Sequence, residues 1–155
     1  MNILFIVGRI AFVLIFILSG AQKLFDISGT AAMIESKLIV PPILIDLETK
    51  LQGLTGMPLP RLLAIVAGVV EIGGGLMIAA NVGTRIAAVA LIVFTALATY
   101  LFHDFWAMTG ADRTANMVQA MKNLSMIGAL IIFFVLGPWR PATNGYRDRN
   151  SDSPY

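Results

Sequence analysis

The chain has 155 residues, of which 57% are hydrophobic and 13% are charged, and its net charge is +2. Because a soluble domain carries about 25% charged residues, this composition excludes an ordinary soluble protein. The sequence contains no cysteine, which excludes thiol–disulfide chemistry, cysteine-ligated metals and iron–sulfur clusters. The basic residues are scattered and are not interleaved with aromatic residues, so we expect no nucleic-acid partner.

The first apolar run covers residues 3–25 and reads ILFIVGRIAFVLIFILSGAQKLF. A membrane-spanning helix needs about 20 predominantly apolar residues, so this run is long enough to span. A secretory signal peptide is the alternative, and it would begin with a positive stretch before its apolar core. The first eight residues are apolar or neutral, and Arg9 lies inside the run, which favours a spanning helix.

The connection that follows, residues 26–60, mixes apolar and charged residues. Its stretches GTAAMIESKLIV and ILIDLETKLQGL are separated by Pro41 and Pro42, which end regular structure. This pattern predicts two short amphipathic helices lying at the membrane surface.

Three further apolar runs cover residues 61–80, 84–102 and 118–136. Asn81 and Gly83 indicate a tight hairpin between the second and third runs, and Gly137 with Pro138 ends the fourth. Only helices and closed barrels span a bilayer, and these runs lack the alternation of barrel strands.

The predicted fold is therefore an all-α membrane protein, a four-transmembrane-helix bundle with short amphipathic surface helices between helices 1 and 2. Residues 1–139 form the membrane domain, and residues 140–155 form a polar tail that we expect to be disordered.

Four spans place both termini on one side of the membrane. Lysine and arginine gather on the cytoplasmic side of membrane proteins. The short segments on the terminal side carry Arg85, Arg140, Arg147 and Arg149. The opposite side carries Lys37, Lys50 and Arg113 among many acids, so we expect cytoplasmic termini.

Two ionisable residues lie deep within predicted spans. At 1.5 Å rise per residue, Arg9 is roughly 9 Å and Glu71 roughly 13 Å from the cytoplasmic ends of their helices. An unpaired arginine at mid-helix costs about 2.5–3.5 kcal/mol, so we expect an intramembrane ion pair between Arg9 and Glu71. Gly68 and Gly75 flank Glu71 and leave room for a neighbouring helix. The alternative is that this pair is purely structural and fixes the helix register.

A second group of polar residues lies toward the opposite ends of the spans. It predicts a ligand pocket lined by Lys23, His103, Asp104, Lys122 and Asn123. The alternative is structural: the lysines extend to the membrane surface, Asp104 faces water, and the single histidine packs without a ligand. One histidine and separated carboxylates make no convincing metal site, and no catalytic residue can be assigned.

Four motifs occur in order: Arg9 followed by SGAQKL, then EIGGGLMIAANVGTRIAA, HDFW and MKNLSMIGALI. On these motifs the chain resembles the DoxX family of small bacterial membrane proteins, over nearly its whole length up to Trp139. The resemblance implies a four-helix bundle in the bacterial cytoplasmic (inner) membrane with its termini inside. The family-like positions are Arg9, Ser19, Gly20, Lys23, Glu71, Gly74, Gly75, His103, Phe105, Lys122 and Asn123. The acidic first connection with its double proline departs from the family pattern.

Some members of the family are membrane subunits of quinone-linked thiosulfate oxidation, and others resemble partners of redox-stress enzymes. The leading hypothesis is thus a quinone-linked or redox-accessory membrane component with an intramembrane polar pocket. Quinone is then the candidate ligand, and no covalent cofactor is expected. The alternative is a non-enzymatic anchor or scaffold subunit, and a solute carrier ranks last because no broken helix pair or inverted repeat is evident. Besides the lipid bilayer, the expected partner is another protein or a second copy in the membrane. Whether the protein is an enzyme stays open.

Overall fold

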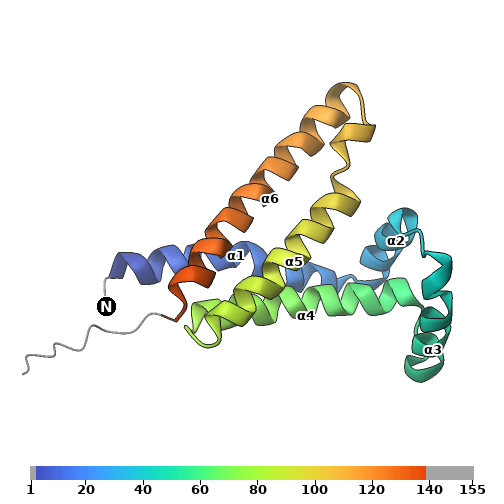
Figure 1. Cartoon of the computed structure of the whole chain (residues 1–155), viewed down its shortest axis with the longest axis horizontal. Helices are drawn as coiled ribbons and strands as arrows, with labels where there is room; N and C mark the ends of the chain where they lie inside the picture. Colours follow the sequence, from blue (N-terminus) through green and yellow to red (C-terminus); the bar gives the residue numbers. More distant parts are fainter. Residues whose placement is uncertain (1–2, 139–155) are drawn as a thin grey trace, which may run out of the picture.

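The computed structural model describes residues 3–138, and within that range the regular structure is entirely helical (Figure 1). Four helices are long and apolar enough to cross a membrane, which confirms the predicted fold class. They are α1 (Ile3–Phe25), α4 (Leu59–Ala79), α5 (Thr84–Phe102) and α6 (Gly110–Leu136). The predicted tail at residues 140–155 lies outside the described residues.

The helix α6 begins at Gly110, ahead of the apolar run that predicted a span from residue 118. Its polar first turns continue the helix beyond the apolar stretch, and Asp112 lies in the first turn, where a negative charge is favourable. A helix of 27 residues is about 40 Å long, more than the roughly 30 Å hydrocarbon core. The apolar run therefore identifies only the part of α6 that would lie in the hydrocarbon core, and not the whole helix.

The connection between the first two spans contains the two predicted short helices, α2 (Ile27–Lys37) and α3 (Ile45–Thr55), with a 3-10 turn η1 (Pro42–Leu44) between them. The side chain of Asp26 accepts a 2.9 Å hydrogen bond from the Gly29 N–H and so begins α2 directly after α1. The helix α2 packs on α4, whereas α3 has no buried residue and projects from the end of α4 (Figure 1).

The contact between α1 and α4 depends on glycine. A Cβ atom at Gly20 would lie 2.7 Å from the Gly68 carbonyl oxygen, and one at Gly68 would lie 2.9 Å from the Gly20 oxygen. Further along, a Cβ atom at Gly75 would lie 2.9 Å from the side chain of Ile17. The predicted close approach of a neighbouring helix at Gly68 and Gly75 is thus confirmed.

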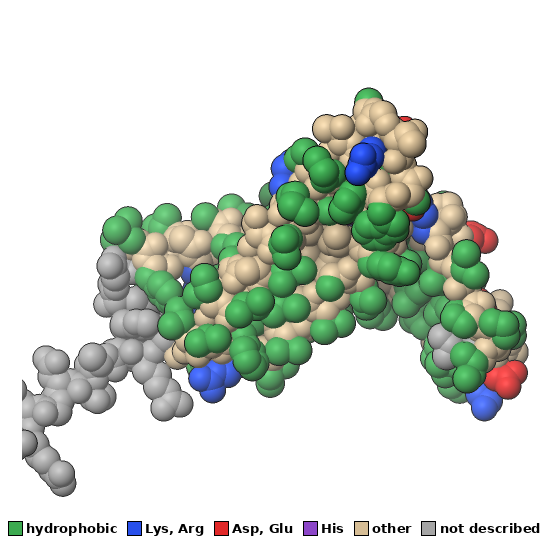
Figure 2. Space-filling model, turned by 45° about the horizontal axis from the view of Figure 1, so that its top comes forward, with side chains coloured by type: hydrophobic (Ala, Val, Ile, Leu, Met, Phe, Trp, Pro, Cys, Tyr) green, Lys and Arg blue, Asp and Glu red, His purple; other side chains and the backbone are tan. Residues whose placement is uncertain are grey.

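The four spans meet in one buried cluster at the middle of the molecule. Its members come from all four helices and are Val13, Phe16, Ile78, Ala87, Ala88, Leu91 and Leu130. From this cluster the α5–α6 hairpin extends away from the α1–α4 pair, so the spans are arranged as two crossing hairpins (Figure 1). Hydrophobic side chains cover much of the visible face, and charged side chains gather mainly toward its ends (Figure 2).

The glycine contact predicts a position-dependent effect of adding one methyl group to α1. Gly20→Ala should destabilise the protein by about 1–3 kcal/mol, because backbone atoms of α4 would have to shift. Gly8→Ala is the matched control, since nothing lies within 4 Å of the added atom. Thermal unfolding in detergent, followed by circular dichroism, measures both. Equal melting temperatures for the two variants would contradict the contact.

Candidate functional site

The predicted ion pair between Arg9 and Glu71 is wrong. Arg9 is buried, and its Nη1 donates a 2.6 Å hydrogen bond to the side-chain oxygen of Asn81. Its Nη2 lies 3.5 Å from the Thr84 hydroxyl oxygen, and its guanidinium lies over the ring of Phe5, 5.2 Å from the centroid. Neutral dipoles and aromatic faces therefore surround this cation.

The register of α1 against α4 explains why the prediction failed. Gly20 lies opposite Gly68, and the two helices are antiparallel, so moving toward the start of α1 moves toward the end of α4. Arg9 therefore lies level with the α4–α5 turn, where Asn81 adopts a left-handed conformation with φ 62°. The depth of a residue along its own helix does not reveal the register between two helices. The sequence identifies Asn81 only as the end of a helix.

Glu71 instead pairs with Lys23, whose Nζ lies 2.7 Å from Glu71 Oε2. The same ammonium donates a 2.6 Å hydrogen bond to the Ser19 hydroxyl and lies 5.7 Å from the centroid of the Phe94 ring. The Glu71 side chain is 4% exposed and that of Lys23 is 25% exposed. The Lys23–Glu71 pair thus joins α1 to α4 beside α5, with a buried glutamate and a partly exposed lysine side chain.

A ladder of polar side chains joins α5 to α6. The Thr99 hydroxyl donates a 2.6 Å hydrogen bond to the Thr95 carbonyl and accepts one of 2.7 Å from the Asn123 amide. Above it, His103 Nδ1 lies 3.1 Å from Asn116 Oδ1. The Asn116 amide nitrogen is committed to the Asp112 carbonyl, so Oδ1 faces the ring and Nδ1 donates. In the neutral ring Nε2 is then the acceptor.

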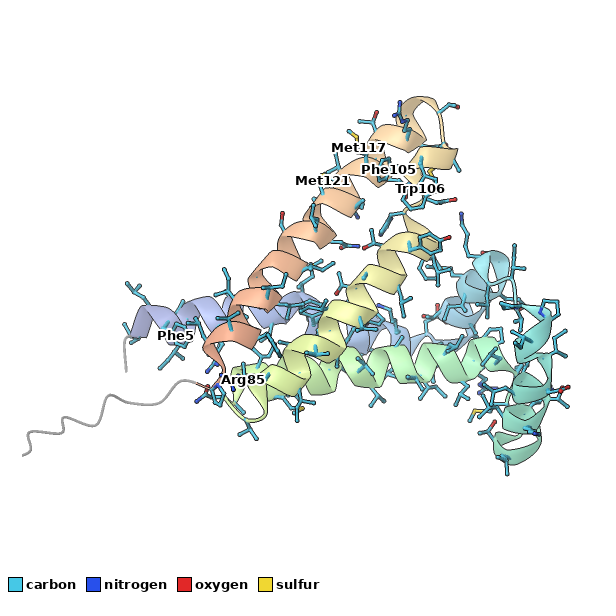
Figure 3. All side chains as sticks on the ribbon, viewed as in Figure 1. Phe5, Arg85, Phe105, Trp106, Met117 and Met121 are labelled. Carbon is cyan, nitrogen blue, oxygen red and sulfur yellow. The ribbon has the colours of Figure 1, made fainter. Side chains whose placement is uncertain are left out.

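Aromatic residues mark the end of the α5–α6 hairpin that is remote from Arg85 (Figure 3). Tyr100 and Trp106 are exposed, and their ring centroids are 5.9 Å apart. Tyrosine and tryptophan are enriched at the boundary between lipid and water. His103 lies between them in the chain, so this end of the hairpin has the composition of the headgroup level.

Four of the five residues of the predicted pocket have separate partners in the described part of the chain. Lys23 pairs with Glu71, His103 contacts Asn116, and Asn123 bonds Thr99. Asp104 forms a 3.2 Å ion pair with Lys37, which ties α2 to the segment after α5. Lys122 is exposed on α6. No hydrogen bond or ion pair among residues 3–138 joins two of the five, so a shared pocket stays a prediction.

Several polar contacts were not predicted from the sequence. They involve Lys37, Asn81, Thr84, Thr95 and Asn116. Only one had a usable signal: Thr95, Thr99 and His103 recur at four-residue spacing and therefore share one face of a helix. Thr95 is 3% exposed, and its hydroxyl has no hydrogen-bond partner within the described range. No group of three or more potential metal ligands occurs there either.

The observed pairing predicts which double substitutions couple. Lys23→Met should lower stability by up to about 3 kcal/mol, somewhat less than for a fully buried pair, because it leaves the Glu71 carboxylate uncompensated. Adding Glu71→Leu should recover part of that loss, whereas Arg9→Leu and Glu71→Leu should simply add. Unfolding of the single and double variants in detergent measures both cycles. Coupling of Arg9 with Glu71 but not of Lys23 with Glu71 would refute the assignment.

Comparison with known proteins agrees with this architecture. A sequence model of the family described as DoxX matches residues 4–104. The chain is 32% identical over 136 residues to Inner membrane protein YphA of Escherichia coli (strain K12), which covers 88% of this chain and 84% of the relative. It is 29% identical over 133 residues to Inner membrane protein YqjF of the same organism, covering 86% and 83%. No solved structure matches the chain. By the extent of the family match and the identity to its relatives, this integral membrane protein belongs to the DoxX family.

Proposed function

We propose that this protein is a quinone-linked or redox-accessory component of the bacterial inner membrane, and that the Lys23 ammonium receives the quinone head. The observation that carries the proposal is the Lys23–Glu71 pair, in which the Glu71 side chain is 4% exposed while the Lys23 side chain is 25% exposed. Intramembrane charges of this kind are costly and mark functional sites more often than surface charges do.

The chemistry of a quinone fits these groups. A quinone needs an apolar slot with a few hydrogen-bond donors. An ammonium has three donors. Lys23 Nζ contacts Glu71 and Ser19, which leaves one donor for a further acceptor. A donor placed on a quinone carbonyl stabilises the negative charge that develops there on reduction.

The other predicted pocket residues enter the proposal unequally. His103 and Asn123 are held by hydrogen bonds on the α5–α6 hairpin and are the further polar groups available to a head group. Asp104 is paired with Lys37, and Lys122 is exposed, so neither is given a direct role. Because the sequence lacks cysteine, an iron–sulfur centre is excluded, and electrons would come from a partner protein.

A second candidate function is a non-enzymatic anchor of a larger complex. The observation that favours it is the helix α6, in which only Ala120 and Leu130 are buried along 27 residues. Such a helix presents most of its surface to lipid or to another protein. A constant co-purifying subunit, in the absence of bound quinone, would support this function instead.

The quinone proposal predicts a ligand that depends on Lys23. Protein purified from its own membranes in mild detergent should carry quinone in about stoichiometric amount, as measured by mass spectrometry of the extract. Lys23→Met should lose it, and Lys122→Met, the matched control on α6, should keep it. Lys23→Arg should retain part of the ligand, since it keeps the charge and the donors. Quinone that is absent from the wild type, or equally present in a folded Lys23→Met variant, would overturn the proposal.

We further propose that both termini are cytoplasmic. The short α4–α5 turn lies at the end of the bundle where α1 begins and α6 ends, and Arg85 beside it donates a 3.2 Å hydrogen bond to the Phe134 carbonyl. A basic residue in a short loop is typical of the cytoplasmic side.

The orientation is tested with reporter fusions. Green fluorescent protein fused after residue 155 should fluoresce, and alkaline phosphatase fused there should be inactive. Fusions after Met108, in the segment between α5 and α6, should give the reverse pattern. The opposite result at both positions would place the termini outside the cytoplasm.

A further inference from the structure

A pocket of about 290 Å³ lies where α2, α3 and the start of α4 meet. It is separate from the Lys23–Glu71 pair. Its apolar lining comes from Ala31, Leu38, Val40, Pro58 and Pro60, and its charged lining from Glu35, Glu48 and Arg61. The volume is near the lower end of the roughly 300–1,000 Å³ typical of small-molecule sites. It is thus large enough for a small polar group with a few carbons.

The three charged residues converge on the pocket from three different helices. Glu35 lies on α2, Glu48 on α3 and Arg61 on α4. Within residues 3–138 the ion pairs are Lys23–Glu71 and Lys37–Asp104, so neither carboxylate is paired with Arg61. None of the three takes part in a side-chain hydrogen bond in that range either. Two acidic residues and one arginine therefore line the same pocket, and none of the three forms an ion pair within the described range.

The charges of these three side chains are complementary to those of a zwitterion. The two carboxylates favour a cation that can donate several hydrogen bonds, which a primary ammonium does and a quaternary ammonium does not. Arg61 favours an oxyanion that its planar group can bind in a bidentate manner, such as a phosphate. A molecule that carries both groups a few bonds apart would satisfy all three side chains.

The position of the pocket indicates where that molecule comes from. Arg61 lies in the first turn of α4, the span that enters the membrane at this end, and α3 carries exposed apolar side chains such as Ile45, Leu47 and Leu54. Apolar faces of surface helices insert at the boundary between headgroups and acyl chains. The α2–α3 segment projects at this end of α4 (Figure 1). The pocket is therefore level with lipid headgroups.

We propose that this pocket binds the headgroup of a zwitterionic phospholipid, with the primary ammonium of phosphatidylethanolamine between Glu35 and Glu48 and its phosphate on Arg61. The bound lipid would connect α3 to α2 and α4. Without it, α3 packs only slightly on α4. The inference does not depend on the proposed quinone function.

The test uses the full-length protein in nanodiscs that contain phosphatidylglycerol with either phosphatidylethanolamine or phosphatidylcholine. Native mass spectrometry of the protein released from the nanodiscs counts the lipid molecules that it retains. The wild type should retain one phosphatidylethanolamine, at least about tenfold in preference to phosphatidylcholine, and Glu35→Gln/Glu48→Gln should abolish that preference. Asp46→Asn, on α3 but outside the pocket lining, is the matched control and should behave as the wild type. Arg61→Gln should weaken retention of both lipids, whereas Arg113→Gln on α6 should not.

Two outcomes of the lipid comparison would overturn the proposal. One is equal retention of the two lipids by the wild type, and the other is an unchanged preference in Glu35→Gln/Glu48→Gln. Soluble glycerophosphoethanolamine, titrated against the bound lipid in detergent, separates the two sources of the same chemistry. If it displaces the lipid at equal concentration, the pocket serves a free zwitterion and the lipid assignment is wrong. Circular dichroism of each variant confirms that any loss does not come from unfolding.

Discussion

The close approach of α1 to α4 through Gly20 and Gly68 sets the register on which the polar contacts of α1 depend. Because no side chain separates the two backbones there, the helices cannot slide past one another without a clash. That register brings Lys23 to Glu71 at the level of the glycines and Arg9 to Asn81 farther along, at the end of α4. Each of these two cations is thereby compensated, Lys23 by a carboxylate and Arg9 by neutral oxygens and aromatic rings.

The second hairpin, α5–α6, is attached to the first through a small apolar cluster and then extends away from it. It carries its own polar ladder, from Thr99 and Asn123 to His103 and Asn116. The ion pair between Lys37 and Asp104 connects α2 to the outer end of this hairpin. Polar contacts between the hairpins lie at their two ends, where Arg9 meets Thr84 and Lys37 meets Asp104.

The two proposed sites differ in what they would recognise. The partly exposed Lys23 beside a buried carboxylate suits a carbonyl head group that develops negative charge. The pocket of Glu35, Glu48 and Arg61 has unpaired charges of both signs and suits a zwitterion. The first lies within the bundle, and the second lies where α4 enters the membrane. A membrane protein can use the second to hold its surface helices while the first exchanges its ligand.

Hydropathy alone determined the number of spans, their approximate ends and the short helices between the first two. The reason is physical: lipid offers the backbone no hydrogen bonds, so every long apolar run must satisfy its own as a helix. The start of α6 at Gly110 escaped this reasoning because a helix that leaves the membrane no longer needs apolar residues. The sequence also identified Arg9, Lys23, Glu71 and His103 as unusual, since a charge within an apolar run is costly wherever it lies. Only the tertiary structure decided their partners. Those partners depend on the register and rotation of packed helices, and a displacement of a few turns exchanges Glu71 for Asn81 as the group that Arg9 meets.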